Sequence, residues 1–224
     1  MHPELDLMTK KARPRNRSAS SQRWIAEHEN DEVVQKARRL GFRSRARFKL
    51  EEIDQKDHLL VPGQIVVDLG AAPGGWAEYA VEKVGRKGLV VGLDILPMEP
   101  VPGVVFLQAD FTEDAALKAL EAVPGMGPGI DLVLCDMAPN ISGIDVSDQA
   151  RAMYLAELAL DFAKKRLKSG GIFLAKVFQG TGFDEFLADL RTNFTTVVSR
   201  KPKASRARSR EMYLLAKGYR RADD

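Results

Sequence analysis

The stretch that most constrains the fold runs from Val66 to Trp76 and reads VVDLGAAPGGW. The apolar run at 65–69 predicts a buried strand, and the pattern at 76–84 predicts a helix. Between them, small residues predict a tight turn, in which glycine lets the backbone approach a ligand closely. A strand, a glycine-rich turn and a helix start together form a βα unit that can bind a ligand at the helix N-terminus.

The spacing within this turn argues against a phosphate-binding loop. Gly70, Gly74 and Gly75 give the pattern Gly-x-x-x-Gly-Gly. That pattern is neither the Gly-x-Gly-x-x-Gly of dinucleotide binders nor a loop ending in Gly-Lys-Ser/Thr. Pro73 also removes a backbone donor from the turn. We therefore expect a ligand without phosphates, such as S-adenosylmethionine; the alternative is a turn whose glycines only connect a strand to a helix.

Strands and helices alternate after Pro62-Gly63. The runs that predict strands are 65–69, 88–94, 104–108, 131–135, 172–178, 195–199 and 211–216. The patterns that predict helices between them are 76–84, 114–122, 148–167 and 183–193, with Ser169-Gly170-Gly171 as a turn. This alternation predicts an α/β fold with a mostly parallel seven-stranded sheet and helices on both faces. The last two strands have no helix between them, so we expect them to pair antiparallel.

Upstream of this domain the sequence predicts two short helices. Asp31 is the expected N-cap of the first, which Gly41 ends, and Ser44 is the expected N-cap of the second, which reaches about Asp57. We divide the chain into a basic flexible arm (1–22), a basic helical extension packed on the core (23–60), the main domain (61–218) and a tail (219–224). The whole chain of 224 residues suffices for one sizeable α/β domain with an appendage.

Positive charge is confined to a few segments. Residues 1–23 carry six Lys/Arg against two acids, whereas 36–49 carry seven Lys/Arg and 200–210 carry six, both without any acid. Residues 50–199 carry 12 Lys/Arg against 22 acids, a net charge of −10. Basic clusters around an acidic core are typical of proteins that bind a polyanion. A merely solubilising surface would not require acids to be absent there, so we expect a nucleic-acid partner.

Several classes of protein are disfavoured by composition. No apolar run approaches the roughly 20 residues that span a bilayer, and the polar N-terminus lacks an apolar signal core. The single cysteine, Cys135, excludes an internal disulfide and fits a reducing compartment. The three histidines lie far apart in the sequence, so no metal site is expected. We expect a cytoplasmic protein that needs no metal.

Polar residues stand at four successive strand ends, namely Asp94, Asp110, Asp136 and Lys176. Ligands bind beyond the carboxyl ends of the strands in an open α/β sheet. Asp94 follows Gly70 by 24 positions, close to the offset of roughly 20 at which an acid meets ribose hydroxyls. Asp110 can accept from an adenine amino group. Each acid alone could equally be a helix cap or turn aspartate, but the set favours an acidic pocket that suits a cationic sulfonium ligand.

Lys176 interrupts a run, Ile172 to Phe178, that otherwise reads as a fully buried strand. Buried lysines are rare unless they are paired or functional. The alternative is a lysine whose stem is buried while its amine reaches the rim. Glu211 opens the last strand directly after a basic run and taken alone would be an ordinary surface acid.

These residues together resemble the FtsJ-like family of ribosomal RNA 2′-O-methyltransferases, over about residues 17–217. The motifs that carry the resemblance are Ser18-Ala19-Ser20-Ser21, Arg43-Ser44-Arg45-Ala46 with Phe48-Lys49-Leu50, Asp68 to Trp76, Asp136-Met137-Ala138-Pro139-Asn140, Lys176-Val177-Phe178-Gln179-Gly180 and Ser205 to Glu211. The resemblance implies a Rossmann-like class I S-adenosylmethionine-dependent methyltransferase fold. It also implies transfer of a methyl group to a ribose 2′-hydroxyl of 23S ribosomal RNA, with the A-loop uridine as target.

The family's site residues are carried over by the same resemblance. Its Lys-Asp-Lys-Glu tetrad corresponds to Lys49, Asp136, Lys176 and Glu211. Its S-adenosylmethionine contacts correspond to Gly74, Trp76, Asp94, Asp110 and Asp136. The partner implied is the large ribosomal subunit or its precursor. Because nothing in the sequence demands a dimer, we expect a monomer with no obligate protein partner and no membrane association.

A ribose hydroxyl is a poor nucleophile until its proton is withdrawn, so a base within hydrogen-bond reach is required. We assign Lys176 as that base, Asp136 as the group that orients it, and Lys49 and Glu211 as holding the ribose. Burial and nearby cations favour the neutral amine that a base needs, whereas Asp136 and Glu211 favour the charged amine. The alternative is a charged lysine that only positions the hydroxyl.

Three other functions are weighed against this one. Asp136-Met137-Ala138-Pro139 is similar to the Asp-Pro-Pro-Tyr motif of nucleobase N-methyltransferases, but no aromatic residue follows Pro139 to stack a flipped base, and that chemistry does not need Lys176. A non-catalytic RNA-binding or ribosome-assembly factor on the same fold is the second. A nicotinamide-dependent dehydrogenase is disfavoured by the turn spacing and Pro73.

Overall fold

The computed structural model describes residues 31–127, 129–139, 145–205 and 209–221. The predicted arm (1–22), the motif at 18–21, Asn140, and Arg206 to Arg208 of the last basic run lie outside the described residues. Among the described residues, no helix is both long enough and apolar enough to cross a membrane.

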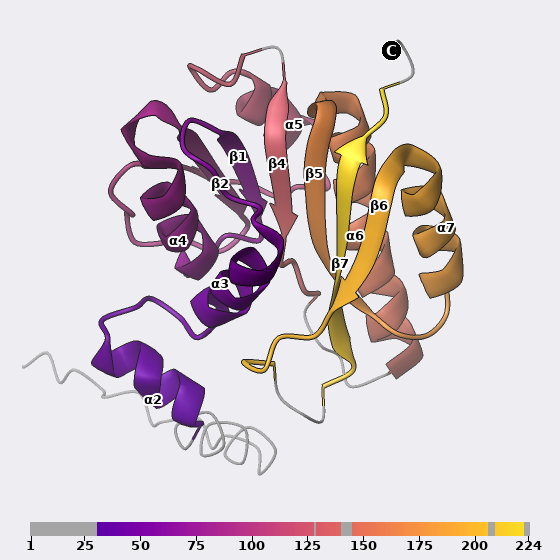
Figure 1. Ribbon diagram of the computed structural model, residues 1–224, viewed down its shortest axis with the longest axis horizontal. Helices are drawn as coiled ribbons and strands as arrows, with labels where there is room; N and C mark the ends of the chain where they lie inside the picture. Colours follow the sequence, from indigo (N-terminus) through magenta and orange to yellow (C-terminus); the bar gives the residue numbers. More distant parts are fainter. Residues whose placement is uncertain (1–30, 128, 140–144, 206–208, 222–224) are drawn as a thin grey trace, which may run out of the picture.

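One sheet of seven strands organises the described chain (Figure 1). The strands are β1 (Ile65–Leu69), β2 (Leu89–Asp94), β3 (Val104–Gln108), β4 (Ile130–Cys135), β5 (Leu167–Phe178), β6 (Phe194–Arg200) and β7 (Glu211–Tyr219). Their order across the sheet is β3-β2-β1-β4-β5-β7-β6. Strands β1 to β5 pair parallel, and β7 pairs antiparallel with both β5 and β6, which confirms the predicted topology.

Helices cover both faces of the sheet. They are α3 (Ala46–Asp57), α4 (Gly75–Val84), the 3₁₀ turn η1 (Gly85–Lys87), α5 (Asp114–Glu121), α6 (Asp145–Arg166) and α7 (Phe183–Asn193). Helix α2 (Glu32–Arg39) precedes α3 and lies apart from the sheet (Figure 1). Apolar side chains of α3 and α4, such as Leu50 and Trp76, pack on one face with Val66 of β1. Side chains of α5, α6 and α7 pack on the opposite face with Val67. The period-2 alternation of each inner strand thus fills two cores, one on each side.

The strand order reverses between β1 and β4, because the chain turns from β1 towards β2 and β3 on one side and later returns to β4 on the other. Leu69 lies opposite both Leu93 of β2 and Cys135 of β4, so these three strands end level with one another. An open α/β sheet forms its ligand crevice outside the carboxyl ends of the strands at such a reversal.

The ends of α2 agree with the sequence prediction, whereas the start of α3 differs from it by one residue. The Asp31 side chain accepts from the N–H groups of Val33 and Val34, as its predicted N-cap role requires. Gly41, with φ of 74°, ends α2 as predicted. The Ser44 prediction is wrong by one residue, since the N-cap of α3 is Arg45. The Ser44 hydroxyl accepts from the N–H of Ala46 two residues on, which is a turn before the helix rather than a cap.

The largest difference from the sequence prediction lies at the start of β5. The predicted turn at 169–171 is wrong, because the strand begins at Leu167. The register against β4 shifts between Ile130 and Leu132, so residues 168–171 form an irregularity within the strand rather than a turn before it. Gly170 has φ of 78° there. Helix α6 also begins three residues before the predicted start, and β7 extends to Tyr219.

Candidate active site

A hollow of about 500 Å³ opens at the carboxyl edge of the sheet, where the strand order reverses. We call it the Asp94 hollow. Its lining comes from the ends of β1, β2, β3 and β4 and includes Gly70, Asp94, Asp110, Asp136 and Pro139. Three of the four polar residues that the sequence places at strand ends therefore meet in one cavity. Its volume falls within the roughly 300–1,000 Å³ range of small-ligand sites.

The first two acids of this hollow also hold the backbone around it. Asp94 accepts from the N–H of Ala72 in the glycine turn at 2.9 Å and from the N–H of Leu96 at 2.8 Å. Asp110 accepts from both the N–H and the hydroxyl of Thr112, and these hydrogen bonds lower the pKa of its carboxyl. Asp110 is therefore ionised near neutral pH, and both carboxyls are fixed in direction, as a site for ribose hydroxyls or an amino group requires.

The glycine turn between β1 and α4 is shaped by close contacts. A Cβ on Gly70 would lie 2.8 Å from the backbone nitrogen of Met137, and its φ of +82° also disfavours other residues. Gly74 is the N-cap of α4, with φ of +105°. The lining of the Asp94 hollow does not include Gly74 or Trp76. The Trp76 indole is 3 % exposed and donates to the carbonyl of Ala46, so it ties α3 to α4.

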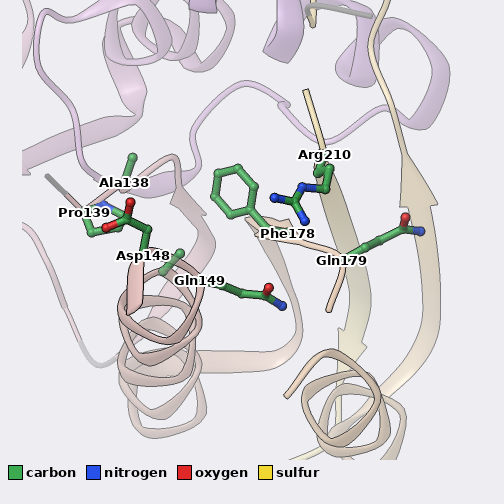
Figure 2. Close-up of a pocket in the computed structure, with 8 residues that line it drawn as sticks. Ala138, Pro139, Asp148, Gln149, Phe178, Gln179 and Arg210 are labelled. Carbon is green, nitrogen blue, oxygen red and sulfur yellow. The ribbon is translucent and has the colours of Figure 1, made fainter. Parts of the chain in front are cut away.

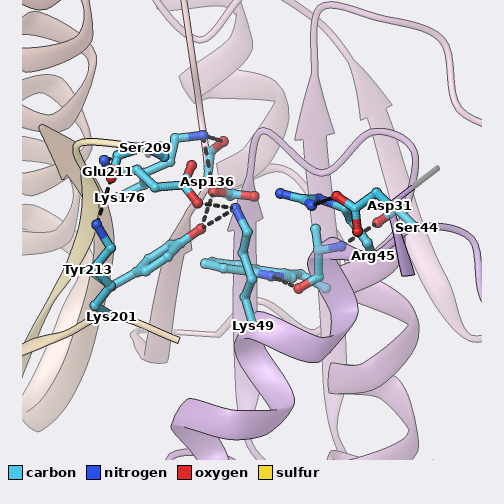
Figure 3. Close-up of polar contacts among 12 residues, drawn as sticks. Asp31, Ser44, Arg45, Lys49, Asp136, Lys176, Lys201, Ser209, Glu211 and Tyr213 are labelled. Carbon is cyan, nitrogen blue, oxygen red and sulfur yellow. Dashed lines mark hydrogen bonds and ion pairs between the residues drawn. The ribbon is translucent and has the colours of Figure 1, made fainter. Parts of the chain in front are cut away.

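The four residues of the expected tetrad lie together beside this hollow (Figure 3). Lys49 donates to Glu211 Oε1 at 2.7 Å. Lys176 donates to the backbone carbonyl of Asp136 at 2.7 Å, and its Nζ lies 3.1 Å from Asp136 Oδ1. Helix α3, the end of β4, β5 and β7 thus bring one side chain each to the same place.

Tyr213 joins the two ion pairs into one network. Lys49 donates to the Tyr213 hydroxyl at 3.1 Å, and that hydroxyl donates to Asp136 Oδ1 at 3.0 Å. Burial, followed by the charges of Asp136 and Glu211, raises the pKa of Tyr213 well above its usual value. The phenol therefore stays protonated and can serve as this donor. Sequence reasoning missed Tyr213, although its position two residues after Glu211 on β7 places both side chains on one face of the strand.

Glu211 is ionised in this arrangement. Burial alone would raise the pKa of its carboxyl, but the charge of Lys49, the hydrogen bond that Lys49 donates and the more distant charge of Lys176 outweigh burial and lower it. Lys49 and Lys176 are both nearly fully buried, at 6 % and 8 % exposure. Buried lysines of this kind require compensating acceptors, which Glu211, Asp136 and the Asp136 carbonyl supply.

Two further titratable groups, on β1 and β4, are buried in the sheet near the network. Asp68 of β1 is fully buried, and neither carboxyl oxygen has a hydrogen-bond partner of normal geometry among the described residues. Burial, then the charges of Asp136 and Asp94, raise the pKa of Asp68 well above its usual value and so favour its protonated form. Burial likewise raises the pKa of the Cys135 thiol to about 12, so this cysteine is an inert core residue.

A second hollow, of about 230 Å³, lies between the segment that follows Asp136 and the ends of β5 and α6 (Figure 2). We call it the Phe178 hollow. It is lined by Ala138, Pro139, Asp148, Gln149, Ala152, Phe178, Gln179 and Arg210. Ala138 and Pro139 also line the Asp94 hollow, so the segment that follows Asp136 is a wall between the two.

Basic side chains surround this edge. The exposed face of α2 carries Lys36, Arg38 and Arg39. Arg45, one turn before Lys49 on α3, is paired with Asp31 (Figure 3). The third basic segment reaches the site through Arg210, next to Glu211 in the chain. The described parts of the second and third basic segments thus supply Arg45 and Arg210 near the network that carries the tetrad.

Comparison with known proteins agrees with this geometry. The family described as FtsJ-like methyltransferase matches residues 42–219. A protein of Alkalilimnicola ehrlichii named ribosomal RNA large subunit methyltransferase E is 59% identical over 206 residues, 92% of this chain and 98% of its own. A protein of Dichelobacter nodosus with the same name is 55% identical over the same shares.

Solved structures show the same architecture. A Plasmodium falciparum protein assigned as a ribosomal RNA methyltransferase superposes with a TM-score of 0.70 at 28% identity, over 80% of this chain and 98% of its own. A Clostridium thermocellum protein assigned as an rRNA methylase superposes with a TM-score of 0.52 at 18% identity, over 75% of this chain and 95% of its own, and shows the fold alone.

Proposed function

The chain belongs to the FtsJ-like methyltransferase family, and from that premise we propose that it methylates a ribose 2′-hydroxyl of large-subunit ribosomal RNA. The observation that carries the proposal is the network of Lys49, Asp136, Lys176 and Glu211 beside the Asp94 hollow. A nucleobase methyltransferase has no need of a buried lysine fixed at a strand end, whereas an alcohol acceptor needs a base.

The Asp94 hollow fits S-adenosylmethionine in size and charge. Asp94 and Asp110 are oriented acceptors for its ribose hydroxyls and adenine amino group, and Asp136 adds negative charge that suits a sulfonium cation. Contacts from Gly74 and Trp76 would come from their backbone at the start of α4, because the Trp76 indole is buried under α3. When bound, S-adenosylmethionine supplies the methyl group.

Lys176 is the group that accepts the proton of the 2′-hydroxyl. The carbonyl and carboxylate of Asp136, which lines the Asp94 hollow, hold its amine beside that hollow, within reach of a ribose placed there. A neutral amine takes the proton as the ribose oxygen becomes the nucleophile. General-base assistance of this kind contributes roughly 10²–10⁴-fold to a rate.

Lys49 and Glu211 hold the ribose of the acceptor. Each is only partly satisfied by its partner, because an ammonium has three donors and a carboxylate has about four acceptor sites. Lys49 already gives two donors, to Glu211 and Tyr213. Its third donor and the free lone pairs of Glu211 can engage sugar oxygens and so orient the 2′-hydroxyl toward Lys176.

The basic residues of α2 and the segment around Arg210 bind RNA phosphates, which give affinity but little sequence information. We propose that the substrate is 23S rRNA in the large subunit or its precursor, with the A-loop uridine as the target. We also propose that the protein acts as a cytoplasmic monomer, with 1–22 as a basic arm and 23–60 as an extension that carries Lys49 to the site.

Mapping the methylated position tests the proposal. The protein is incubated with large-subunit particles and labelled methyl donor, and the RNA is then cleaved with alkali. We expect one blocked step in the alkaline ladder, because a 2′-O-methyl group removes the attacking hydroxyl. Label in a base with the ladder intact would show a nucleobase methyltransferase, and donor binding without transfer would show a non-catalytic RNA-binding factor; either result would contradict the proposal.

A further inference from the structure

The Phe178 hollow lies next to the tetrad, and the proposed reaction as described so far gives it no occupant. Its residues stand next to the tetrad in the chain. Ala138 follows Asp136 by two positions, and Phe178 follows Lys176 by two. Arg210 directly precedes Glu211. The elements that deliver the tetrad therefore also build this hollow, on the opposite side of the Ala138–Pro139 wall from the Asp94 hollow.

The chemistry of a nucleotide restricts what can lie there. The carbon that bears the 2′-hydroxyl is bonded to the carbon that bears the base. A ribose whose hydroxyl meets Lys176 must therefore place its base immediately beside the network. The Asp94 hollow is needed for the methyl donor, so the base has to go to the other side of the wall. Resting on the proposed function, we propose that the Phe178 hollow receives the base of the nucleotide being methylated.

The size of the hollow fits one base. Sites for drug-sized ligands begin at roughly 300 Å³. At about 230 Å³ the Phe178 hollow is smaller, which suits a single flat ring better than a second whole cofactor.

Its lining also fits a base. The Phe178 ring is half-buried at the end of β5, with the Arg210 guanidinium close by and Pro139 across the hollow (Figure 2). Unstacked RNA bases are recognised by stacking on aromatic rings and guanidinium planes, and by hydrogen bonds to their edges. Gln179 is exposed at the rim and carries an amide that can give and accept such bonds.

The floor of the hollow is a built structure rather than a chance gap. With its amide oxygen turned toward the loop after β5, Gln149 of α6 accepts from the N–H groups of Gly180 at 3.2 Å and Thr181 at 2.7 Å. Gly180 has φ of +144°, and a Cβ there would lie 1.8 Å from the end of the Gln149 amide. Ala152, one turn further along α6, is small and nearly buried. The loop is thus held against α6, and the space above Ala152 stays open.

The test compares removal of the base with removal of the ring. Large-subunit particles are reconstituted with RNA whose target nucleotide is intact or abasic, with the 2′-hydroxyl kept in both. Single-turnover methyl transfer is measured for the wild type and for Phe178→Ala. We expect either change alone to slow transfer about 10- to 100-fold, the size of one base-stacking contact. We expect the two changes together to be no worse than either alone, because each removes the same contact.

Tyr154→Ala is the matched control, since it removes an aromatic side chain that is 52% exposed on α6 and does not line the Phe178 hollow. It should transfer methyl groups at the wild-type rate. Phe178→Leu keeps apolar volume without the aromatic face and serves if Phe178→Ala does not fold. If the rate losses from Phe178→Ala and from the abasic target multiply when the two are combined, the inference is overturned. It is also overturned if the loss from Phe178→Ala disappears when a neighbouring nucleotide, and not the target, is abasic. Failure of the wild type to methylate any ribose would instead contradict the proposed function.

Discussion

The side-chain nitrogen of Lys176 contacts Asp136 at two atoms, the backbone carbonyl oxygen at 2.7 Å and carboxyl Oδ1 at 3.1 Å. The carbonyl contact depends on the path of the chain after β4 rather than on a side chain. The position of Lys176 is therefore set mainly by the sheet, in which β4 and β5 pair parallel up to Cys135 and Ala175. The carboxylate of Asp136 adds negative charge and a second contact that orients the Lys176 side chain.

Tyr213 links the ion pairs without touching the reacting atoms. Tyr213→Phe keeps the ring, which packs 5.6 Å from Trp76 between centroids, but loses the hydroxyl. Its loss removes the hydrogen bonds to Lys49 and Asp136 inside a buried site, so we expect a loss of about 1–3 kcal/mol of unfolding free energy. Chemical denaturation measures this loss. The transfer rate should fall less than for Lys176→Arg; a larger fall would mean that the phenol contacts the substrate.

The glycine turn permits a paired test of close approach. Gly70 and Gly63 both have positive φ, +82° and +87°, but only at Gly70 would a Cβ meet backbone, at 2.8 Å. We expect Gly63→Ala to cost about 1–2 kcal/mol from the left-handed backbone alone. Gly70→Ala should cost a further 1–3 kcal/mol or so by overpacking and should weaken S-adenosylmethionine binding. Denaturation and calorimetry of both variants check this. Equal losses and equal affinities would contradict the close-contact explanation.

The exposed arginines of α2 should act through RNA phosphates. Replacing Arg38 and Arg39 by Gln should lower RNA affinity and reduce the slope of log affinity against log salt by about 1.4–1.8, since each phosphate contact contributes about 0.7–0.9. The matched control is Lys118→Gln with Lys165→Gln, in the last turns of α5 and α6. Those helices run antiparallel to the strands, so these lysines lie at the edge of the sheet away from the site. An unchanged slope in the α2 variant would remove α2 from the RNA interface.

Asp57 at the end of α3 gives a prediction for pH. Arg200 of β6 donates to both of its carboxyl oxygens, at 2.6 and 2.7 Å. That hydrogen bonding lowers the pKa of Asp57, against the opposing effect of burial and with help from the charges of Arg200 and Lys217. A lowered acid pKa stabilises the fold above the ordinary value of about 3.9, and the stabilisation is lost as pH falls through the lowered pKa.

Asp57→Asn should therefore lose about 1.5–3 kcal/mol of unfolding free energy at pH 7, and the difference from wild type should shrink toward pH 2. Urea unfolding at both pH values measures it. Glu121→Gln is the control, because its pair with Arg166 is half exposed and should be worth about 0–1 kcal/mol. A difference for Asp57→Asn that stays the same at low pH would contradict the assigned ion pair.

The sequence predicted the sheet well because its signal is local. Apolar runs ended at Asp94 and before Asp136, and Lys176 stood near the end of another; parallel strands necessarily bring such ends to one edge. The irregular start of β5 was not predictable in this way, because Ser169-Gly170-Gly171 has the composition of a turn and only the pairing with β4 makes it part of a strand. The predicted N-cap at Ser44 was wrong for a similar reason. A serine hydroxyl can accept from an N–H in a turn as well as from one at the start of a helix, and here it accepts from the N–H of Ala46.

The site was predicted only in part. The tetrad residues are identified by a resemblance, and the structure adds their distances. Tyr213 and Phe178 were not singled out, because an aromatic residue in a strand most often packs in the core, and no local pattern shows that its hydroxyl or ring faces a cavity. Gln149 and Gly180 come from elements far apart in the sequence, so the hollow that they form depends on tertiary packing.

Lys176→Arg tests the central claim most directly, because arginine keeps the positive charge but cannot accept a proton. The measurement is the single-turnover rate of methyl transfer to the mapped ribose, with S-adenosylmethionine affinity measured by calorimetry on the same preparation. With Lys176 as the base, the affinity stays within a few-fold of wild type while the rate falls by roughly 10²–10⁴-fold. A variant that binds the donor and transfers its methyl group at near wild-type rate would show that Lys176 is not the base.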